Sequence, residues 1–292
     1  MSGDLQTIRG LSQIAGDYDG FILDLWGCLH DGVTAFPAAV DAARNLKQAG
    51  GRILILSNAP RRAAEVIARC RELGIDERCY HAVLSSGEDA WQNMKQRSDP
   101  WYADLGTGCF HLGPDKDAGL REGLGLTIVA RPEEADFLLN TGAHRPEDSV
   151  ETYAGELEAA LAAGLPMICA NPDLEVIRGG QREICAGALA RRYEEGGGEV
   201  RYHGKPYPPI YETAKEILGV SDPAKILCVG DALRTDVAGA NACGMASLWV
   251  LDGLHGPALG LTPGGAVSLE RVEEEMAAIG QRADYAIPVL RW

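Results

Sequence analysis

Short apolar runs alternate with longer amphipathic stretches along most of the chain. Continuous apolar runs of this length are typical of buried strands in a parallel sheet. The predicted strands are 20–24, 52–57, 109–112, 126–129, 136–140, 166–170, 226–229, 247–251 and 285–290. The predicted helices are 38–50, 60–73, 146–163, 181–195, 208–218, 233–243 and 268–279. This alternation predicts an α/β fold whose parallel sheet is covered by helices on both faces.

Length and composition narrow the class of protein. The 292 residues, 46% of them hydrophobic, suffice for two domains with buried cores. A formal net charge of -15 argues against non-specific binding to nucleic acid or to an anionic membrane. No apolar run approaches the roughly 20 residues that a membrane-spanning helix requires, and a secretory signal pattern is lacking. The eight cysteines form no CxxC pair, so we expect reduced thiols and a cytoplasmic location.

Acidic residues follow two of the predicted strands. Asp24 ends the strand 20–24, and Asp231 and Asp236 follow the strand 226–229. Open α/β proteins bind ligands at the carboxyl edge of the sheet, and two carboxylates at one strand–helix junction can converge on a hard cation. Taken singly, each acid has an alternative interpretation as a turn residue, a cap or an early-helix charge. Their shared position at strand ends favours a ligand site.

Two further polar segments lie at predicted strand–helix junctions. Ser57 and Asn58 offer a hydroxyl, an amide and helix N-terminal N–H groups to a phosphate, although an ordinary N-cap fits equally well. Lys205 lies in the loop 204–209, which glycine and prolines stiffen, whereas most lysines are solvated surface charges. An acid, a hydroxyl, a lysine and an acid pair in this order are hard to explain as four independent caps.

These segments, from Asp24-Leu25-Trp26-Gly27 to Gly230-Asp231, resemble the four motifs of the haloacid dehalogenase-like superfamily, in the same order. More narrowly, the chain is similar over nearly its whole length to the class IIA branch, the NagD-like and 4-nitrophenylphosphatase-like enzymes. The resemblance implies a three-layer Rossmann-like core at 1–83 plus 204–292 and an inserted α/β cap at 84–203. The glycine run at 196–198 is a predicted joint between them. Relatives of this class often dimerise through the cap, which suggests a homodimer and leaves the oligomeric state open.

The resemblance also implies a function. It is that of a Mg²⁺-dependent phosphatase acting on a small phosphorylated metabolite, such as a sugar or nucleotide phosphate, through an aspartyl-phosphate on Asp24. The implied catalytic residues are Asp24 and Lys205. The implied phosphate- and substrate-binding residues are Ser57, Asn58 and Lys205, with Asn171 and Asp173 of an Asn-Pro-Asp segment in the cap. The implied Mg²⁺ ligands are Asp24, the backbone carbonyl of Trp26, Asp231 and Asp236.

Trp26 departs from the pattern of superfamily phosphatases, which carry a second aspartate two residues after the nucleophile. That aspartate protonates the leaving group and later activates water, and an indole can do neither. Such general acid–base help contributes roughly 10²–10⁴-fold to a rate, so slow hydrolysis is expected unless another group substitutes. The candidate substitutes, which the sequence does not rank, are His30, Asp31, His203 and Asp173.

Other hypotheses follow from the same departure. A dehalogenase also lacks the second aspartate, but the pair Asp231 and Asp236 would repel its nucleophile in the absence of a cation. A phosphonatase needs a cap lysine, and Lys95 and Lys116, the lysines of the predicted cap, lie in no recognisable motif. The alternative from another class is a sensor that binds a phosphorylated metabolite without hydrolysing it. A dinucleotide-binding domain is disfavoured because no GxGxxG follows a predicted strand.

Overall fold

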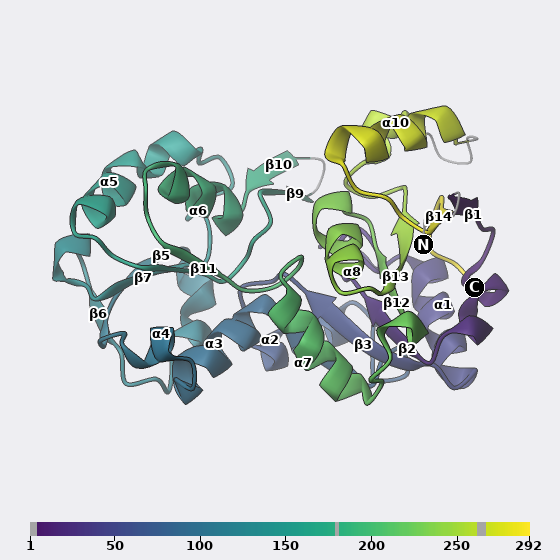
Figure 1. Cartoon of the computed structure of the whole chain (residues 1–292), viewed down its shortest axis with the longest axis horizontal. Coiled ribbons are helices and arrows are strands. Elements are labelled where there is room, and N and C mark those ends of the chain that lie inside the picture. Colours follow the sequence, from purple (N-terminus) through teal and green to yellow (C-terminus); the bar gives the residue numbers. More distant parts are fainter. Residues whose placement is uncertain (1–4, 179–180, 262–266) are drawn as a thin grey trace. The chain divides into compact units, whose positions relative to one another are not determined.

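The structure, a computed structural model, describes residues 5–178, 181–261 and 267–292. These form two compact units (Figure 1). The first contains residues 5–57 and 67–84 and the described residues from 205 onward, and the second contains 58–66 and the described part of 85–204. The core and cap boundaries expected from the sequence remain a prediction. The segment 58–66, which that prediction gives to the core, packs in the second unit.

The first unit is built on a seven-stranded sheet. In spatial order its strands are β1 (Gln6–Thr7), β14 (Tyr285–Ile287), β13 (Ala246–Val250), β12 (Ile226–Gly230), β2 (Gly20–Leu23), β3 (Arg52–Ser57) and β4 (Ala82–Ser85). Central β2 pairs in parallel with both β12 and β3, so that Leu23 lies opposite Val229 on one side and Ile55 on the other. The chain moves outward from β2 through β3 to β4, and later returns to the other side of β2 with β12. The carboxyl ends of β2 and β12 therefore flank a topological switch point, where open α/β sheets bind ligands.

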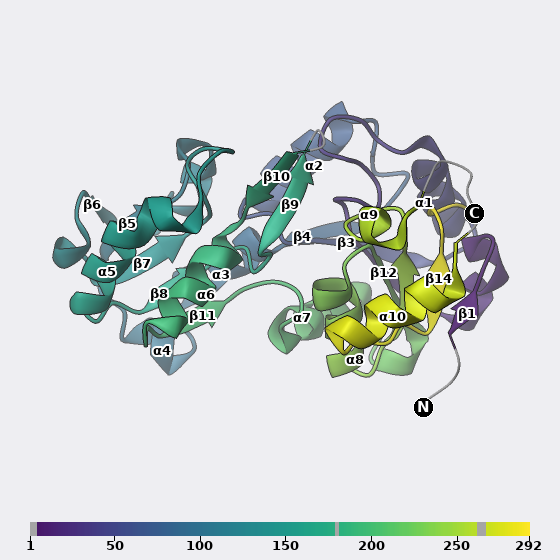
Figure 2. The ribbon, with the colours of Figure 1, turned by 90° about the horizontal axis from the view of Figure 1, so that it is seen from above.

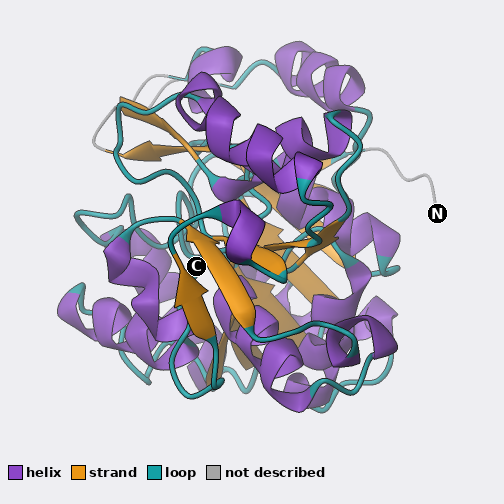
Figure 3. Ribbon diagram, turned by 90° about the vertical axis from the view of Figure 1, so that its left-hand side faces the viewer, coloured by secondary structure: helices purple, strands orange, loops and turns teal. Residues whose placement is uncertain are grey.

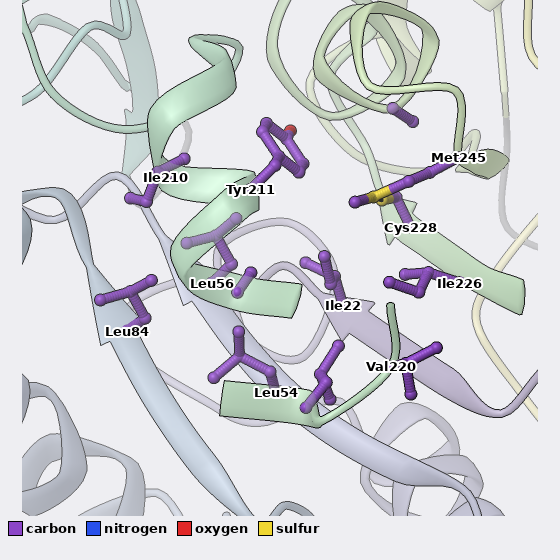
Figure 4. Close-up of a cluster of buried hydrophobic side chains, with 13 residues drawn as sticks. Ile22, Leu54, Leu56, Leu84, Ile210, Tyr211, Val220, Ile226, Cys228 and Met245 are labelled. Carbon is purple, nitrogen blue, oxygen red and sulfur yellow. Dashed lines mark hydrogen bonds between the residues drawn. The ribbon is translucent and has the colours of Figure 1, made fainter. Parts of the chain in front are cut away.

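Helices bury the apolar faces of this sheet. They are α1 (Pro37–Gln48), α7 (Pro208–Leu218), α8 (Ala238–Ala242), α9 (Gly256–Leu259), α10 (Leu269–Ile279) and most of α2 (Ala63–Glu72). Figure 4 shows Ile210 and Tyr211 of α7 in one buried cluster with Leu54 and Leu56 of β3 and Ile22 of β2. Because the strand residues Gly20–Leu23 are all buried, β2 is a central strand covered on both faces, as its continuous apolar run predicts.

The second unit has its own five-stranded sheet, in the order β11 (Val200–Tyr202), β8 (Met167–Cys169), β7 (Phe137–Asn140), β5 (Gly108–Leu112) and β6 (Thr127–Val129). Leu138 and Met167 face α5 (Ala154–Ala162) and α6 (Ala186–Glu195). Phe137 and Ile168, one position along, lie in the cluster on the other face with α3 (Ser86–Gln96) and α4 (Pro100–Ala103). This two-residue alternation on strands covered by helices confirms the predicted α/β class (Figure 3).

Three predicted helix starts are wrong, among them that of the helix expected at 146–163, because α5 begins at Ala154 after a 3-10 turn at Val150–Tyr153. Residues 181–184 form β10 (Gln181–Ile184), which pairs antiparallel with β9 (Glu175–Arg178), so α6 begins only at Ala186 (Figure 2). Helix α2 begins at Ala63 rather than at Pro60, because the Glu88 carboxylate accepts the Ala63 N–H. The helix predicted from Leu233 does begin there, but its first segment, Leu233–Val237, is π-helical and becomes α-helical at Ala238.

Helix α3 was not predicted, although Ser85 caps it and Glu88 follows three residues later, a recognisable helix start. The glycine run 196–198 ends α6 inside the second unit, so it is not where the chain returns to the first. Among the described residues, none of the helices combines the length and the apolar character needed to cross a membrane.

Candidate active site

Three carboxylates converge at the carboxyl edge of the first unit's sheet. Asp24 follows β2, and its N–H donates to Val229 O at 2.8 Å, which fixes its height next to β12. Asp231 follows β12 directly, and Asp236 lies within the π-helical segment that comes next. One carboxylate oxygen from each of the three lies within 4.8 Å of the others, and all three residues are buried. The structure therefore brings together the acids that the sequence analysis singled out.

Lys205 lies among these acids. Its Nζ donates to Asp24 Oδ1 at 2.6 Å and to Asp236 Oδ1 at 2.7 Å, and the residue is only 3% exposed. The interpretation of Lys205 as a solvated surface charge is thereby excluded. One ammonium group faces three carboxylates, so the cluster holds more negative than positive charge when all its groups are ionised. Burying such an excess is costly unless a further cation shares the site.

Glycines make the close approach of these acids feasible. Gly27 has a positive φ of 74°, and a Cβ there would lie 2.0 Å from Asp231 Oδ2. A Cβ on Gly253 would lie 2.3 Å from the same oxygen, and one on Gly230 would lie 2.1 Å from Asp236 Cγ. Side chains at these positions would displace the carboxylates, so the backbone approach expected at Gly27 is observed and recurs at two further glycines.

Hydrogen bonds hold two of the acids in place. Leu254 N–H donates to Asp231 Oδ2 at 2.7 Å, and the Trp249 indole N–H donates to the Asp231 backbone carbonyl at 3.0 Å. Asp236 Oδ2 accepts the Ala232 N–H at 3.2 Å. Burial, followed by the negative charges of Asp24 and Asp236, raises the pKa of Asp231 well above its ordinary value. The protein alone therefore does not favour three ionised carboxylates here.

This donor set fits a divalent metal ion. It presents only oxygen ligands, which hard cations such as Mg²⁺ and Ca²⁺ prefer over nitrogen or sulfur. A divalent cation would also balance the excess negative charge that Lys205 leaves uncompensated. The predicted ligands Asp24, Asp231 and Asp236 thus satisfy the requirement for convergence, while their assignment as metal ligands stays a prediction.

The predicted phosphate-binding residues divide between the two units. Ser57 is the last residue of β3, beside the strand that carries Asp24, and it is buried. Asn58, the next residue, belongs to the second unit, where its Nδ2 donates to Asp173 Oδ1 at 2.8 Å. Asn171 Oδ1 accepts the Asp173 N–H at 3.0 Å. The structure therefore groups Asn58 with the Asn-Pro-Asp segment, and groups Ser57 with the sheet that carries Asp24.

Two of the candidate proton donors serve other partners. Asp31 Oδ1 accepts the N–H groups of Val33 and Thr34 at 2.8 and 2.7 Å, and the Thr34 hydrogen bond is the main cause that lowers the pKa of Asp31. His203 lies in the second unit, with Nδ1 bonded to Asp89 Oδ2 at 2.6 Å and Nε2 bonded to the Tyr102 hydroxyl. Asp31 holds a turn, and both ring nitrogens of His203 are hydrogen-bonded. Neither residue is therefore well placed to give a proton to a leaving group.

Sequence reasoning missed three residues that contact Asp231 and hold it in place. Trp249, Gly253 and Leu254 lie at and just after the end of β13, and all three contact Asp231. The rule that found the other segments, a polar or glycine-rich turn after a buried strand, also applies to the Asp252-Gly253-Leu254-His255 turn.

Comparison with known proteins agrees with this geometry. Residues 21–127 match the haloacid dehalogenase-like hydrolase family and residues 202–274 match an HAD-hydrolase-like family. Human chronophin is 30% identical over 269 residues, which cover 85% of this chain and 87% of chronophin. The chain belongs to the haloacid dehalogenase-like hydrolases. Within that family it is a class IIA member and a hydrolase of the phosphatase type, as the resemblance of its motifs implied.

Solved structures extend the likeness to three dimensions. A haloacid dehalogenase-like hydrolase from Brucella suis has a TM-score of 0.82 and 31% identity, and the match covers 97% of this chain and 99% of that one. A glycerol phosphate phosphatase from Mycobacterium tuberculosis, solved in complex with calcium, has a TM-score of 0.61 and 26% identity. That match covers 82% of this chain and 68% of the mycobacterial one. Phosphatases of this family use divalent metals, which agrees with the donor set described above.

Proposed function

We propose that this protein is a Mg²⁺-dependent phosphatase that hydrolyses the phosphomonoester of a small metabolite through an aspartyl-phosphate on Asp24. The observation that carries the proposal is the buried cluster of Asp24, Asp231, Asp236 and Lys205, in which three carboxylates and one ammonium group meet at the switch point of the sheet. Sugar phosphates, nucleotides and glycerol phosphates are the substrates to test first. The M. tuberculosis relative is itself a glycerol phosphate phosphatase.

Asp24 supplies the nucleophile. A carboxylate oxygen of Asp24 forms a bond to phosphorus while the bond between phosphorus and the leaving oxygen breaks, and the leaving oxygen then takes a proton from solvent water. Water next attacks phosphorus, releases inorganic phosphate and regenerates the Asp24 carboxylate. Lys205, held against Asp24 and Asp236, supplies positive charge where an anionic carboxylate must approach an anionic phosphate. Ser57, at the end of the neighbouring strand, is proposed to donate to a phosphoryl oxygen.

Asp24, Asp231, Asp236 and the backbone carbonyl of Trp26 are proposed to hold the Mg²⁺. When bound, Mg²⁺ supplies further neutralisation of the phosphoryl oxygens. Asn58, Asn171 and Asp173 are proposed to contact the rest of the substrate, and their mutual hydrogen bonds support a shared role. The proposals of a homodimer and of a cytoplasmic location also stand. The location is supported by the free state of all eight cysteines.

The residue at position 26 sets the expected substrate preference. The indole N–H does not ionise at neutral pH, so Trp26 cannot transfer a proton to a leaving group. Esters with a good leaving group should therefore be hydrolysed faster than alkyl phosphates of similar size. This same residue favours the second candidate, a sensor that binds phosphorylated metabolites without turnover. The clustered acids suit a metal-dependent reaction and so favour the phosphatase over a dehalogenase, which needs no metal. A phosphonatase would need a cap lysine, and Lys95 donates to the Gly123 carbonyl at 2.9 Å.

Phosphate release from p-nitrophenyl phosphate and a panel of phosphorylated metabolites, with Mg²⁺ and with EDTA, tests the proposal. We expect release that requires Mg²⁺ and that falls by at least about 10³-fold in Asp24→Asn, because an amide cannot replace the attacking carboxylate. Asp41→Asn, at an exposed acid of α1, is the matched control. Thermal stabilisation by a metabolite without phosphate release at high enzyme concentration would instead establish the sensor.

A further inference from the structure

A hydrogen-bonded series from Glu275 through His255 to Leu233 leads to the segment that carries Asp236. His255 follows the turn that holds Asp231, and its Nε2 accepts the N–H of Leu233 at 3.4 Å, a long hydrogen bond. Its Nδ1 lies 2.8 Å from Glu275 Oε1, on α10. Since Nε2 accepts from a backbone N–H, the proton of a neutral imidazole must lie on Nδ1, where it is donated to Glu275. The two contacts therefore define one tautomer and one orientation of the ring.

The hydrogen bond between His255 and Leu233 lies at the start of the segment that carries Asp236. Leu233 is the first residue of the π-helical segment that carries Asp236, and the first N–H groups of a helix lack partners within the helix. Asp236 itself satisfies the N–H of Ala232, and His255 satisfies the next one. Meanwhile Leu254, the neighbour of His255 in the chain, donates to Asp231. One short turn thus fixes both acids that follow β12.

Packing holds His255 in place. It is 8% exposed, and its ring meets that of Trp249 edge to face, with centroids 5.4 Å apart. The indole of Trp249 in turn donates to the Asp231 carbonyl. The ring therefore contacts the elements that carry both acids.

We propose that His255, oriented by Glu275, is a positioning residue for metal binding by Asp231 and Asp236. The proposal rests on the proposed function, because it takes those two acids to be metal ligands. Outer partners of this kind, which fix the groups that bind a metal, typically change metal affinity by roughly 10–100-fold when they are removed.

Two substitutions at the same position separate the two contacts of the ring. In His255→Gln the side-chain oxygen can reach the place of Nε2 and still accept the Leu233 N–H. In His255→Asn the shorter side chain can donate to Glu275 but cannot reach Leu233. We expect the affinity for Mg²⁺, measured by titration calorimetry on the full chain without substrate, to fall about 10-fold in His255→Asn. It should fall clearly less in His255→Gln.

Variants of the partner and of a remote contact complete the test. Glu275→Gln keeps an acceptor for Nδ1–H and should stay near the wild-type affinity, whereas Glu275→Leu removes that acceptor and should weaken Mg²⁺ binding. Asn241→Ala, which removes hydrogen bonds from the end of α8 to Gln281 and Arg282, controls for general loosening of this region and should leave Mg²⁺ affinity unchanged. If His255→Asn does not fold, the Glu275 pair still decides between the outcomes.

The possible results separate the inference from the function. Equal losses in His255→Asn and His255→Gln, or wild-type affinity in both His255→Asn and Glu275→Leu, would overturn the positioning role. In either case the wild-type protein would still bind Mg²⁺ and the proposed function would stand. Failure of the wild-type protein itself to bind Mg²⁺ would remove the proposed function, and the inference with it.

Discussion

The indole of Trp26 lies so close to Gly32 that a Cβ on Gly32 would be 2.2 Å from Trp26 Cη2. Gly32 adopts a positive φ of 87°, and its N–H donates to His30 Nδ1 at 2.9 Å. The His30 ring meets the indole edge to face at 5.4 Å. Gly32 and His30, in the loop after Asp24, thus pack against the indole. The local structure accommodates tryptophan rather than aspartate at position 26.

The first prediction concerns this indole. Trp26→Asp should raise the rate of hydrolysis of alkyl phosphates by about 10-fold or more, because it supplies the missing proton donor, worth roughly 10²–10⁴-fold in favourable cases. The rate with p-nitrophenyl phosphate, whose leaving group needs little protonation, should change much less. Steady-state phosphate release with both substrate types provides the measurement.

Trp26→Asn is the matched control for that experiment. It removes the same indole and leaves the same space beside Gly32, but it offers no titratable group, so it should lower stability like Trp26→Asp without raising the rate. If the asparagine variant gained as much activity as the aspartate variant, relief of crowding rather than proton donation would be responsible.

A second prediction concerns the ammonium group among the acids. Lys205→Met should abolish most activity and, without Mg²⁺, lower the free energy of unfolding by about 3–5 kcal/mol, the usual effect of removing one partner of a buried ion pair. Mg²⁺ should raise the melting temperature of this variant more than that of the wild type, because the metal then compensates unpaired carboxylates.

Lys215→Met, at a lysine of α7 that pairs with exposed Glu212, should change stability by less than about 1 kcal/mol. An identical Mg²⁺ response in Lys205→Met and the wild type would contradict the placement of the metal beside this lysine.

A third prediction tests the space that glycine leaves for Asp231. A Cβ on Gly253 would lie 2.3 Å from Asp231 Oδ2, so Gly253→Ala should displace this carboxylate. We expect at least about 10-fold weaker Mg²⁺ binding, with a loss of stability of about 1–3 kcal/mol from overpacking. Gly16→Ala, at a glycine with open space around it, should affect neither quantity. Titration calorimetry and urea unfolding measure the two effects, and wild-type Mg²⁺ affinity in Gly253→Ala would refute the steric argument.

The sequence predicted the positions of the acids because the rule involved is local. Asp24 and Asp231 each end a continuous apolar run, and parallel strands bring such ends to one edge of the sheet. That rule did not reveal that the same edge would also hold Lys205, which lies in no strand and reaches the acids from the loop before α7. The family resemblance, rather than the residue pattern, gave Lys205 its role.

The missed features depend on contacts between distant segments. Residues 181–184 look helical together with the helix that follows, but pairing with Glu175–Arg178 makes them a strand. Ala63 begins α2 because Glu88, 25 positions later, accepts its N–H. The support of Asp231 by Trp249 and Leu254 likewise joins segments that are adjacent only in the folded sheet. Periodicity within a short window contains no information about such partners.

The last prediction concerns the pH dependence of stability in the second unit. His111 lies on β5 with Nε2 3.0 Å from the Thr141 hydroxyl, and burial, assisted by the positive charges of Arg121 and His144, lowers its pKa from 6.5 to about 4. Between these two values the unfolded chain binds a proton that the folded chain excludes. The neutral ring therefore contributes its full stability above pH 6.5 and loses it as the pH falls toward 4. At 1.36 kcal/mol per pKa unit, this loss is about 3 kcal/mol.

His111→Gln removes the titrating group while keeping a polar side chain of similar reach for Thr141. The free energy of unfolding by urea should therefore fall about 3 kcal/mol less in the variant than in the wild type between pH 7 and pH 4. Thr141→Val retains the buried imidazole and should keep the wild-type slope, because burial rather than the hydroxyl is the main cause of the lowered pKa. Parallel pH profiles for His111→Gln and the wild type would show that this ring is protonated as readily in the folded protein as in the unfolded chain.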